Sequence, residues 1–244
     1  MLSPWSVWKS HFDAFATRPR PEVQVAPAGL GVNQRIALAW SLAVFQLGES
    51  GEGRIAHEID RCRLSGIDDT YRAALRRFVA EEGRHGRILA DLVRALDGSL
   101  LHRTWTDALF TRARRMLGMR LKLVVLLAAE VVGITFYGLL ASRLEPSPFR
   151  SALEQICADE VHHLAFHGAF FRTQTRTPVA RWVFRAMWWA VALCAVATVA
   201  FDHRRTLRAF EVPTRELCAR AALRIREADV LVLGPAVRSV REAA

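Results

Sequence analysis

Two pentapeptides, EEGRH at residues 81–85 and DEVHH at residues 159–163, decide the fold. In each of them a glutamate stands three positions before a histidine: Glu82 before His85, and Glu160 before His163. On an α-helix this spacing puts both side chains on one face. A further glutamate precedes each motif, Glu49 or Glu52 in the first case and Glu130 in the second. Together these residues match the ligand set with which a four-helix bundle holds two iron or manganese ions.

Long segments with helical periodicity predict an all-α fold, and no convincing alternating strand pattern interrupts them. We expect four bundle helices: residues 33–60, 68–96, a third that follows a short helix at 105–117 and ends near 144, and 148–175. Additional helices are expected close to the N-terminus, at 179–201 and at 213–228. The chain would then consist of an N-terminal arm (1–32), a metal-binding bundle (33–175) and a C-terminal apolar helix with a helical tail (176–244).

The glutamates and histidines interrupt the apolar stripe of each bundle helix, and a buried ionised carboxylate is costly unless it is paired or binds a metal. Antiparallel helices bring together residues that lie equally far from their connecting turn. The turn between Glu130 and the second motif falls at Pro146, where the sequence breaks. For the first motif, Glu49 places the turn near Gly66 and fits slightly better than Glu52. We therefore prefer Glu49 as the ligand and keep Glu52 as the alternative.

Four other residues near the motifs have more than one interpretation. Glu81 and Asp159 directly precede the ligand glutamates, so each could accept a hydrogen bond from the histidine of the opposite hairpin or face solvent. His167 lies one turn beyond His163. It is a candidate for a proton donor or an extra ligand, or it is a packed core histidine. Tyr137 is a candidate for a hydrogen bond or an electron relay near the metals, or a core tyrosine. Tyr137 and His167 are the catalytic candidates.

Residues 33–175 resemble the ferritin-like di-iron carboxylate superfamily. The resemblance rests on four segments: GES (48–50), EEGRH (81–85), AAEVVGITFY (128–137) and DEVHHLAF (159–166). GES is similar to the first ligand segment of rubrerythrins, and the other three are similar to aldehyde-deformylating oxygenases and to related N-oxygenases and hydroxylases. A complete rubrerythrin is excluded because the chain has no rubredoxin-like cysteine pair.

The resemblance implies a ferritin-like four-helix bundle and a role for each ligand. Glu82 and Glu160 would bridge the two metals, and His85 and His163 would bind one metal each. Glu49 and Glu130 would complete the two coordination spheres. Two iron ions are the implied cofactor, with manganese in one site as the alternative.

The composition limits which binding partners and which cellular compartment are expected. The net charge of +10 comes from arginines spread at helical spacing, without a nucleic-acid-binding motif, so nucleic acid is not an expected partner. The four cysteines are far apart and the N-terminus lacks a secretory pattern, which favours the cytoplasm. An uncharged run at 186–201 with basic flanks favours a helix that covers the bundle, and contact with the inner membrane surface stays open.

These observations predict a non-haem di-iron enzyme that uses O2 to oxygenate, hydroxylate or desaturate a small lipophilic organic substrate. Its electrons would come from an external reductase, because the sequence contains no nucleotide-binding motif. Two alternatives remain: an iron-binding or peroxide-scavenging protein without an organic substrate, and a membrane-associated quinone or lipid hydroxylase. A homodimer is compatible with the sequence.

Overall fold

The computed structural model describes residues 3–50, 53–105 and 118–234, and all regular structure in these ranges is helical. This confirms the prediction of an all-α fold. The helices are α1 (Trp5–Ala16), α2 (Val32–Glu49), α3 (Gly53–Asp60), α4 (Asp69–Ala95), α6 (Met119–Ala141), α7 (Pro148–Gln174), α8 (Pro178–Asp202), α9 (Arg204–Ala209) and α10 (Thr214–Leu233). The short helix expected at 105–117 lies almost entirely outside the described residues.

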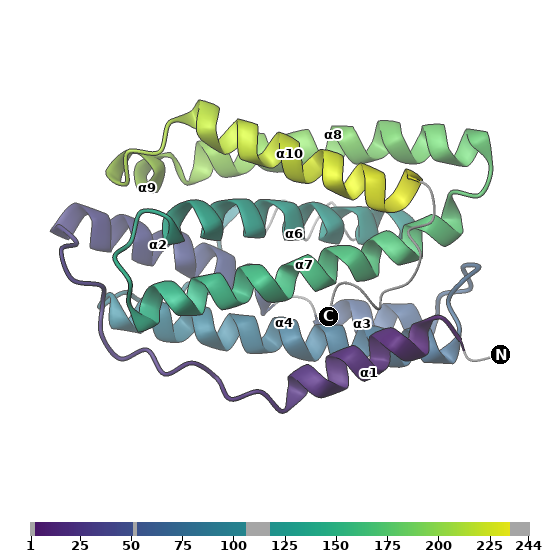
Figure 1. Ribbon diagram of the computed structural model, residues 1–244, viewed down its shortest axis with the longest axis horizontal. Helices are drawn as coiled ribbons and strands as arrows, with labels where there is room; N and C mark the ends of the chain where they lie inside the picture. Colours follow the sequence, from purple (N-terminus) through teal and green to yellow (C-terminus); the bar gives the residue numbers. More distant parts are fainter. Residues whose placement is uncertain (1–2, 51–52, 106–117, 235–244) are drawn as a thin grey trace.

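Helices α2, α4, α6 and α7 run alongside one another along the long axis of the molecule (Figure 1). The main packed pairs are α2 with α4 and α6 with α7, and α4 also meets α7. Local capping fixes where two of these helices begin: Asp68 accepts a hydrogen bond from the Tyr71 amide, and Ser147 accepts one from the Arg150 amide. Pro148 occupies the first turn of α7, where its missing N–H costs nothing.

The helix expected at 33–60 is divided in the structure. Helix α2 ends at Glu49 and α3 begins at Gly53. The physical reason is local composition, because three glycines stand within residues 48–53 and each disfavours a helix by about 1 kcal/mol relative to alanine. As a consequence, the preferred ligand Glu49 is the last residue of α2, whereas Glu52 lies outside the described residues.

The N-terminal arm packs against the bundle. Trp5, Trp8 and Phe12 on α1 are buried, and α1 lies along α4 (Figure 1). The aromatic ring of Phe12 lies 5.4 Å from that of Phe166 on α7 and 6.3 Å from that of Phe78 on α4. Helix α1 therefore covers the side of the bundle on which the two motifs of the sequence meet.

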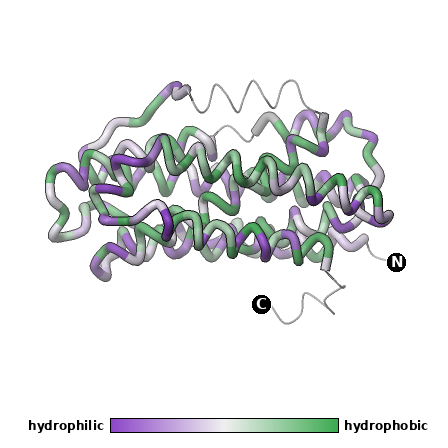
Figure 2. The backbone as a smooth tube through the Cα atoms, turned by 90° about the horizontal axis from the view of Figure 1, so that it is seen from above, coloured by the Kyte–Doolittle hydropathy of each residue, from purple (hydrophilic) through white to green (hydrophobic). Residues whose placement is uncertain are grey.

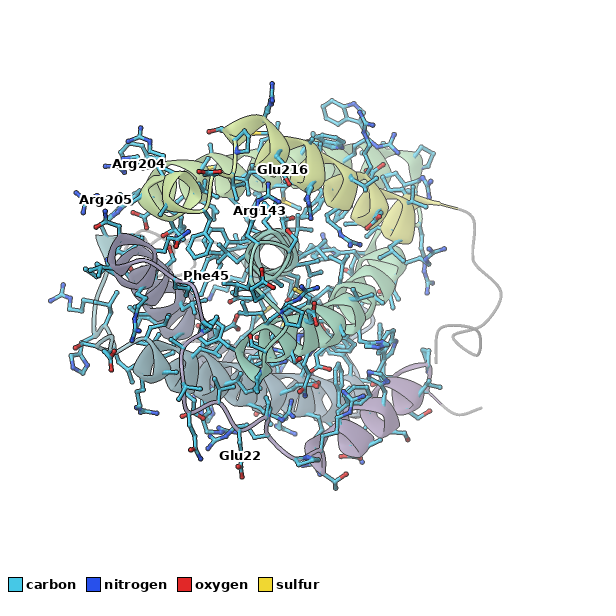
Figure 3. The ribbon with its side chains drawn as sticks, turned by 60° about the vertical axis from the view of Figure 1, so that its left-hand side comes forward. Glu22, Phe45, Arg143, Arg204, Arg205 and Glu216 are labelled. Carbon is cyan, nitrogen blue, oxygen red and sulfur yellow. The ribbon has the colours of Figure 1, made fainter. Side chains whose placement is uncertain are left out.

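The C-terminal helices cover another side of the bundle. Helices α8 and α10 pack against α6, and α10 also packs against α7. Arg143, just after α6, and Glu216 on α10 point toward one another and form a 2.7 Å ion pair (Figure 3). Hydrophobic residues are distributed along the length of the packed helices (Figure 2). The expected covering role of the apolar segment thus agrees with the packing of α8.

Two of the described helices, α6 and α8, are long and apolar enough to cross a membrane by length and composition alone. The most apolar stretch of α6 is 78% buried inside the protein, as expected for a core helix, whereas that of α8 is only 33% buried. The exposed face of α8 carries Val179, Trp182, Val183 and Leu193.

Candidate metal centre

The two Glu-x-x-His motifs meet in the core between α4 and α7. Glu82 and His85 come from α4, and Glu160 and His163 come from α7; none of the four is more than 2% exposed. Each offers a ligand atom, and these atoms all lie within 4.8 Å of one another. The protein therefore contains a buried group of carboxylates and imidazoles that could bind a metal ion.

The contacts cross between the two helices. Nδ1 of His163 lies 2.6 Å from Oε1 of Glu82, and Nδ1 of His85 lies 3.1 Å from Oε1 of Glu160. Although these atoms are close, Glu82 Oε1 and His85 Nδ1 have no hydrogen-bond partner in suitable geometry among the described residues. Buried polar atoms are seldom left without a partner. A carboxylate oxygen and an imidazole nitrogen left without partners in such a cluster are suited to binding a metal ion.

Glu130 and Glu49 extend the cluster on either side. Glu130 on α6 is 5% exposed, and its Oε2 lies 3.8 Å from Nδ1 of His163. Glu49 is half-buried at the end of α2, and the Tyr137 hydroxyl donates to its Oε1 at 3.3 Å. Glu49 also shares a cavity wall with Glu82 and Glu130, so the structure places both remaining predicted ligands next to the four-residue cluster.

The pKa values of the carboxylates in the cluster indicate that a bound metal would replace protons. Burial and the neighbouring carboxylates raise the pKa of Glu49 and of Glu130 well above the ordinary value. Burial also opposes ionisation of Glu160, but the hydrogen bond from Glu130 and the charges of the two histidines hold its pKa well below the ordinary value. In the absence of metal, protons on some carboxylates therefore offset the repulsion among them, and divalent ions would displace those protons.

The pKa values of His85 and His163 are likewise set by burial and by the neighbouring carboxylates, which act in opposite directions. Burial lowers the pKa of His85, but the Glu160 and Asp159 carboxylates reverse the effect and raise it to about 9. Burial likewise opposes protonation of His163, and the carboxylates of Glu82 and Glu160 raise its pKa well above the ordinary value. Both imidazoles lie in a field that attracts positive charge, which is what a metal cation would supply.

The acids that precede the ligand glutamates contact the histidine of the opposite helix. Glu81 Oε2 lies 3.2 Å from Nε2 of His163, and Asp159 Oδ2 lies 3.3 Å from Nε2 of His85. Both acids are buried, so the solvent-facing alternative is wrong for them. Each histidine consequently directs Nδ1 to the cluster and Nε2 to a carboxylate, an arrangement that orients metal-binding imidazoles.

Sequence reasoning missed the residues that hold Asp159. Arg18, just beyond α1, donates to Asp159 Oδ1 at 3.0 Å, and Arg84 Nη1 lies 3.5 Å from Oδ2. Arg84 stands inside the EEGRH motif and could have been noticed there. No local signal marks Arg18, because its role depends on where the N-terminal arm packs.

The two catalytic candidates lie beside the cluster. His167 is fully buried, with Nε2 3.6 Å from Glu130 Oε1, and burial together with the nearby His163 lowers its pKa to about 3. Neither of its ring nitrogens has a hydrogen-bond partner among the described residues. Tyr137 is also fully buried and contacts Glu49 as described above. Both residues thus lie against a predicted ligand, His167 against Glu130 and Tyr137 against Glu49.

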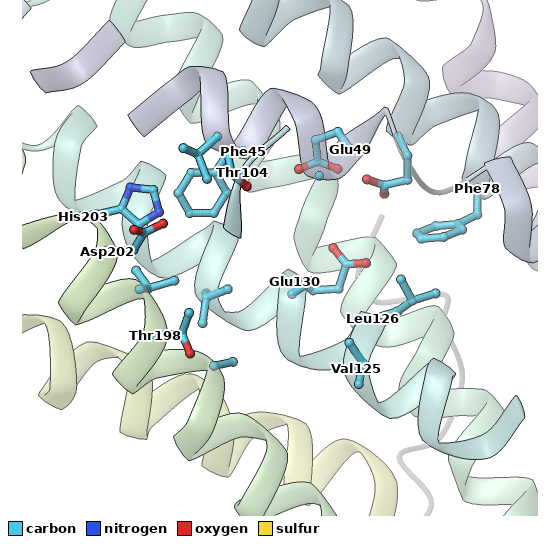
Figure 4. A pocket seen from close by; sticks show the side chains of 17 residues that line it. Phe45, Glu49, Phe78, Thr104, Val125, Leu126, Glu130, Thr198, Asp202 and His203 are labelled. Carbon is cyan, nitrogen blue, oxygen red and sulfur yellow. The ribbon is translucent and has the colours of Figure 1, made fainter. Parts of the chain in front are cut away.

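A cavity of about 150 Å³ borders the cluster. Glu49, Glu82 and Glu130 contribute to its wall, and most of its other lining is apolar (Figure 4). The apolar lining includes Val44, Phe45, Phe78, Val125, Leu126, Val132, Ala195 and Val199. Helix α8, outside the segment predicted as the metal-binding bundle, supplies part of this lining.

The fold and the site define an all-helical protein with a buried Glu/His cluster that could bind a metal ion. Comparisons of the chain with protein-family models, with curated proteins and with solved structures gave no match in any of the three. The resemblance to di-iron carboxylate proteins therefore rests on the motifs and on the geometry of the cluster.

Proposed function

We propose that this protein is a non-haem di-iron oxidoreductase that uses O2 to oxidise a small lipophilic organic substrate. The observation that carries the proposal is the cavity, whose wall includes three predicted metal ligands while most of the remaining lining is apolar. Metal ligands without an adjacent substrate cavity would suit an iron-storage protein equally well. An apolar cavity against the ligands instead favours chemistry on an organic molecule.

In this proposal Glu82, His85, Glu160, His163, Glu130 and Glu49 hold two iron ions. The bound irons supply the redox chemistry with O2, using electrons from an external reductase. Glu81 and Asp159 keep Nδ1 of each histidine directed at the cluster. The Tyr137 hydroxyl holds Glu49 where the cavity meets the ligands. The apolar lining excludes water and orients the substrate through its shape.

Metal content and O2 consumption of the anaerobically purified protein test the proposal. We expect about two irons per chain in the wild type and little or none in a Glu82→Ala/Glu160→Ala double variant. Glu145→Ala, which alters an exposed glutamate between α6 and α7, is the matched control and should bind iron normally. A folded wild-type protein that binds no stoichiometric metal would overturn the di-iron proposal.

The organic substrate requires a separate test, because a peroxide-scavenging or iron-storage protein would also bind iron. Ala129 is exposed and lines the cavity beside Glu130, so Ala129→Phe should obstruct the cavity and leave the ligands in place. We expect lipophilic compounds to stimulate O2 consumption by the iron-loaded wild type but not by this variant. Iron loading far above two per chain, with no stimulation by any organic compound, would favour storage.

The exposed face of α8 supports a second candidate, a membrane-associated hydroxylase of a quinone or lipid. Trp182 and Val179 are each 73% exposed, and the arginines at 181, 185, 204 and 205 are also exposed. Apolar side chains between exposed arginines suit an anionic membrane surface. The redox chemistry would be the same, but the substrate would enter from the lipid phase.

A further inference from the structure

The cavity has a polar end that lies apart from the metal ligands. Figure 4 shows His203 and Asp202 on one side of the cavity, with Glu49 and Glu130 on the other. His203 is 3% exposed and Asp202 is 8% exposed, so both are buried at the junction of α8 and α9. Neither belongs to the predicted ligand set, and a few polar groups that converge in a mostly apolar cavity are typical of a ligand-binding site.

The imidazole of His203 is held firmly in place. Its ring stacks on Phe45 with centroids 4.9 Å apart, and it lies 4.8 Å from the ring of Phe136. Its Nδ1 lies 2.8 Å from Ser41 Oγ. Ser41 Oγ in turn lies 2.6 Å from Thr206 Oγ1, which lies 2.7 Å from the carbonyl oxygen of Ala37.

This chain of contacts determines where each proton lies. A carbonyl oxygen can only accept, so the Thr206 hydroxyl must donate to Ala37. Because Thr206 has then used its single hydrogen, Ser41 must donate to Thr206. Ser41 has then used its own hydrogen, so Nδ1 of His203 must donate to Ser41. Burial lowers the pKa of His203 to about 3, which keeps the ring neutral. A neutral imidazole protonated at Nδ1 carries a lone pair at Nε2.

His203 Nε2 and Thr198 offer acceptor atoms at this end of the cavity. Among the described residues, no hydrogen bond or ion pair involves His203 Nε2, although the side chain is buried and lines the cavity. Thr198 lines the cavity and donates its hydroxyl hydrogen to the Cys194 carbonyl, so its oxygen is left as an acceptor. Asp202 contributes a carboxylate that accepts from the Trp105 indole N–H at 2.9 Å. A ligand that places a hydrogen-bond donor at this end of the cavity would therefore find acceptor atoms.

We propose that this end of the cavity binds the hydrogen-bond donor of a substrate head group, a hydroxyl or an ammonium, through Nε2 of His203. The apolar body of the substrate would then extend along the cavity toward Glu49 and Glu130. The substrate class is therefore an amphiphile with a donor at the end distant from the reacting carbon. This assignment deepens the proposed oxidation, which supplies the chemistry at the other end.

The spacing between two residues of α2 gives the approximate length of such a ligand. Ser41, which anchors His203, and Glu49, one of the predicted metal ligands, are on the same helix, and their Cα atoms are separated by about 12 Å along its axis. Phe45 stands between them and lines the cavity. An unbranched chain of medium length would span this distance with its donor at His203.

Binding of isomeric ligands tests the proposal without any catalysis. Calorimetric titrations would compare n-octanol with heptyl methyl ether, an isomer of similar shape that lacks a hydrogen-bond donor, and with n-octylamine. We expect the alcohol, the amine or both to bind about tenfold more tightly than the ether. His203→Phe should abolish the preference, because phenylalanine keeps the ring but has no acceptor. His203→Gln, which can place an amide oxygen near the position of Nε2, should retain most of it.

The same titrations on metal-free and iron-loaded full-length protein separate the two proposals. A preference for the donor ligands in a protein that fails to bind iron would retain the head-group site and reject the oxidase. Equal binding of the ether and both donor ligands to the wild type would overturn the head-group site, whatever the iron content. A preference that persists in folded His203→Phe would also overturn it. The comparison of alcohol with amine identifies which donor the site selects.

Discussion

Two buried histidines, His203 and His85, illustrate how strongly the surroundings of a residue decide its charge. Burial lowers the pKa of His203 to about 3. Burial also lowers the pKa of His85, but the Glu160 and Asp159 carboxylates raise it to about 9. The first environment favours a neutral ring that recognises a ligand, and the second favours a positive partner such as a metal ion.

The acid sensitivity of the metal-free protein should depend on His203. Between its folded pKa of about 3 and the ordinary value of 6.5, the unfolded chain binds a proton that the folded chain does not. This contribution to stability is therefore complete above about pH 6.5 and is lost as the pH falls. We expect the free energy of unfolding of the wild type, relative to His203→Phe, to decrease by roughly 2 kcal/mol between about pH 7.5 and about pH 5.

Urea unfolding of both metal-free proteins at the two pH values measures this difference. His57→Phe, which changes an exposed histidine in α3, is the control for removing a histidine as such. A wild-type advantage over His203→Phe that stays constant with pH would show that His203 titrates in the folded protein as it does in the unfolded chain.

The acids that hold the two ligand histidines should tune metal affinity. Asp159→Asn leaves an acceptor near His85 Nε2 but removes the negative charge, so we expect iron affinity to fall about 10- to 100-fold. Glu81→Gln should act similarly through His163. Competition with a chromogenic chelator measures the affinity, and Asp69→Asn at the exposed start of α4 is the control. Unchanged affinity in both variants would show that the negative charge of these acids does not affect metal binding.

The sequence was sufficient to predict the residues of the cluster, because Glu-x-x-His spacing and helix periodicity act within single helices. It was insufficient for Arg18, which contacts Asp159 only because the arm folds back over α4 and α7. It also missed His203 as a cavity residue, since its relation to Ser41 depends on packing between segments far apart in the chain.

At the scale of helices, the close approach of α4 to the end of α2 should control the position of Glu49. A Cβ on Gly86 would lie 3.1 Å from Ser50 Oγ and 3.5 Å from Glu49 Cβ. Gly86→Ala should therefore push the end of α2 outward and weaken iron binding. Gly83, on the same helix, would meet only the flexible end of Arg87 at 3.5 Å.

The two substitutions form a matched pair within α4. Gly83→Ala should raise the free energy of unfolding by about 0.5–1 kcal/mol through its helix preference and leave iron affinity unchanged. Gly86→Ala carries the same helix preference, so any loss of iron affinity would report the displaced Glu49. Equal iron affinity in the two variants would show that Ser50 moves aside without disturbing the ligand.

Start and stop signals in the sequence predict the bounds of some helices accurately and those of others less well. The predicted 68–96 and 148–175 agree closely with α4 and α7, since Asp68 and Ser147 cap their first turns. The predicted 213–228 is too short, because α10 continues to Leu233. Its last turns include Val232 and Leu233, which are buried in the core. Tertiary contacts thus extend this helix beyond what its own pattern indicates.

At the scale of the whole molecule, α8 has two different faces. One face packs on α6 and α10 and contributes Ala195 and Val199 to the cavity. The other exposes Trp182, Val183 and Leu193, and the chain carries a net charge of +10. Figure 3 shows Arg204 and Arg205 pointing outward beyond the end of α8. A lipophilic substrate bound beneath such a helix would be close to a membrane if the outer face rests on one.

Vesicle flotation distinguishes a lipid-facing helix from one that is merely exposed. We expect the full-length protein to float with vesicles that contain anionic lipid and to bind weakly to zwitterionic vesicles, because exposed arginines gain about 1 kcal/mol each near an anionic surface. Trp182→Glu/Leu193→Glu should abolish flotation, since both side chains are more than half exposed and their replacement leaves the core intact. Glu145→Gln, which removes one negative charge elsewhere, should not weaken it. Flotation unaffected by the double substitution would reject this face as the contact, and a change from dimer to monomer in the double variant would assign it to a second copy of the chain.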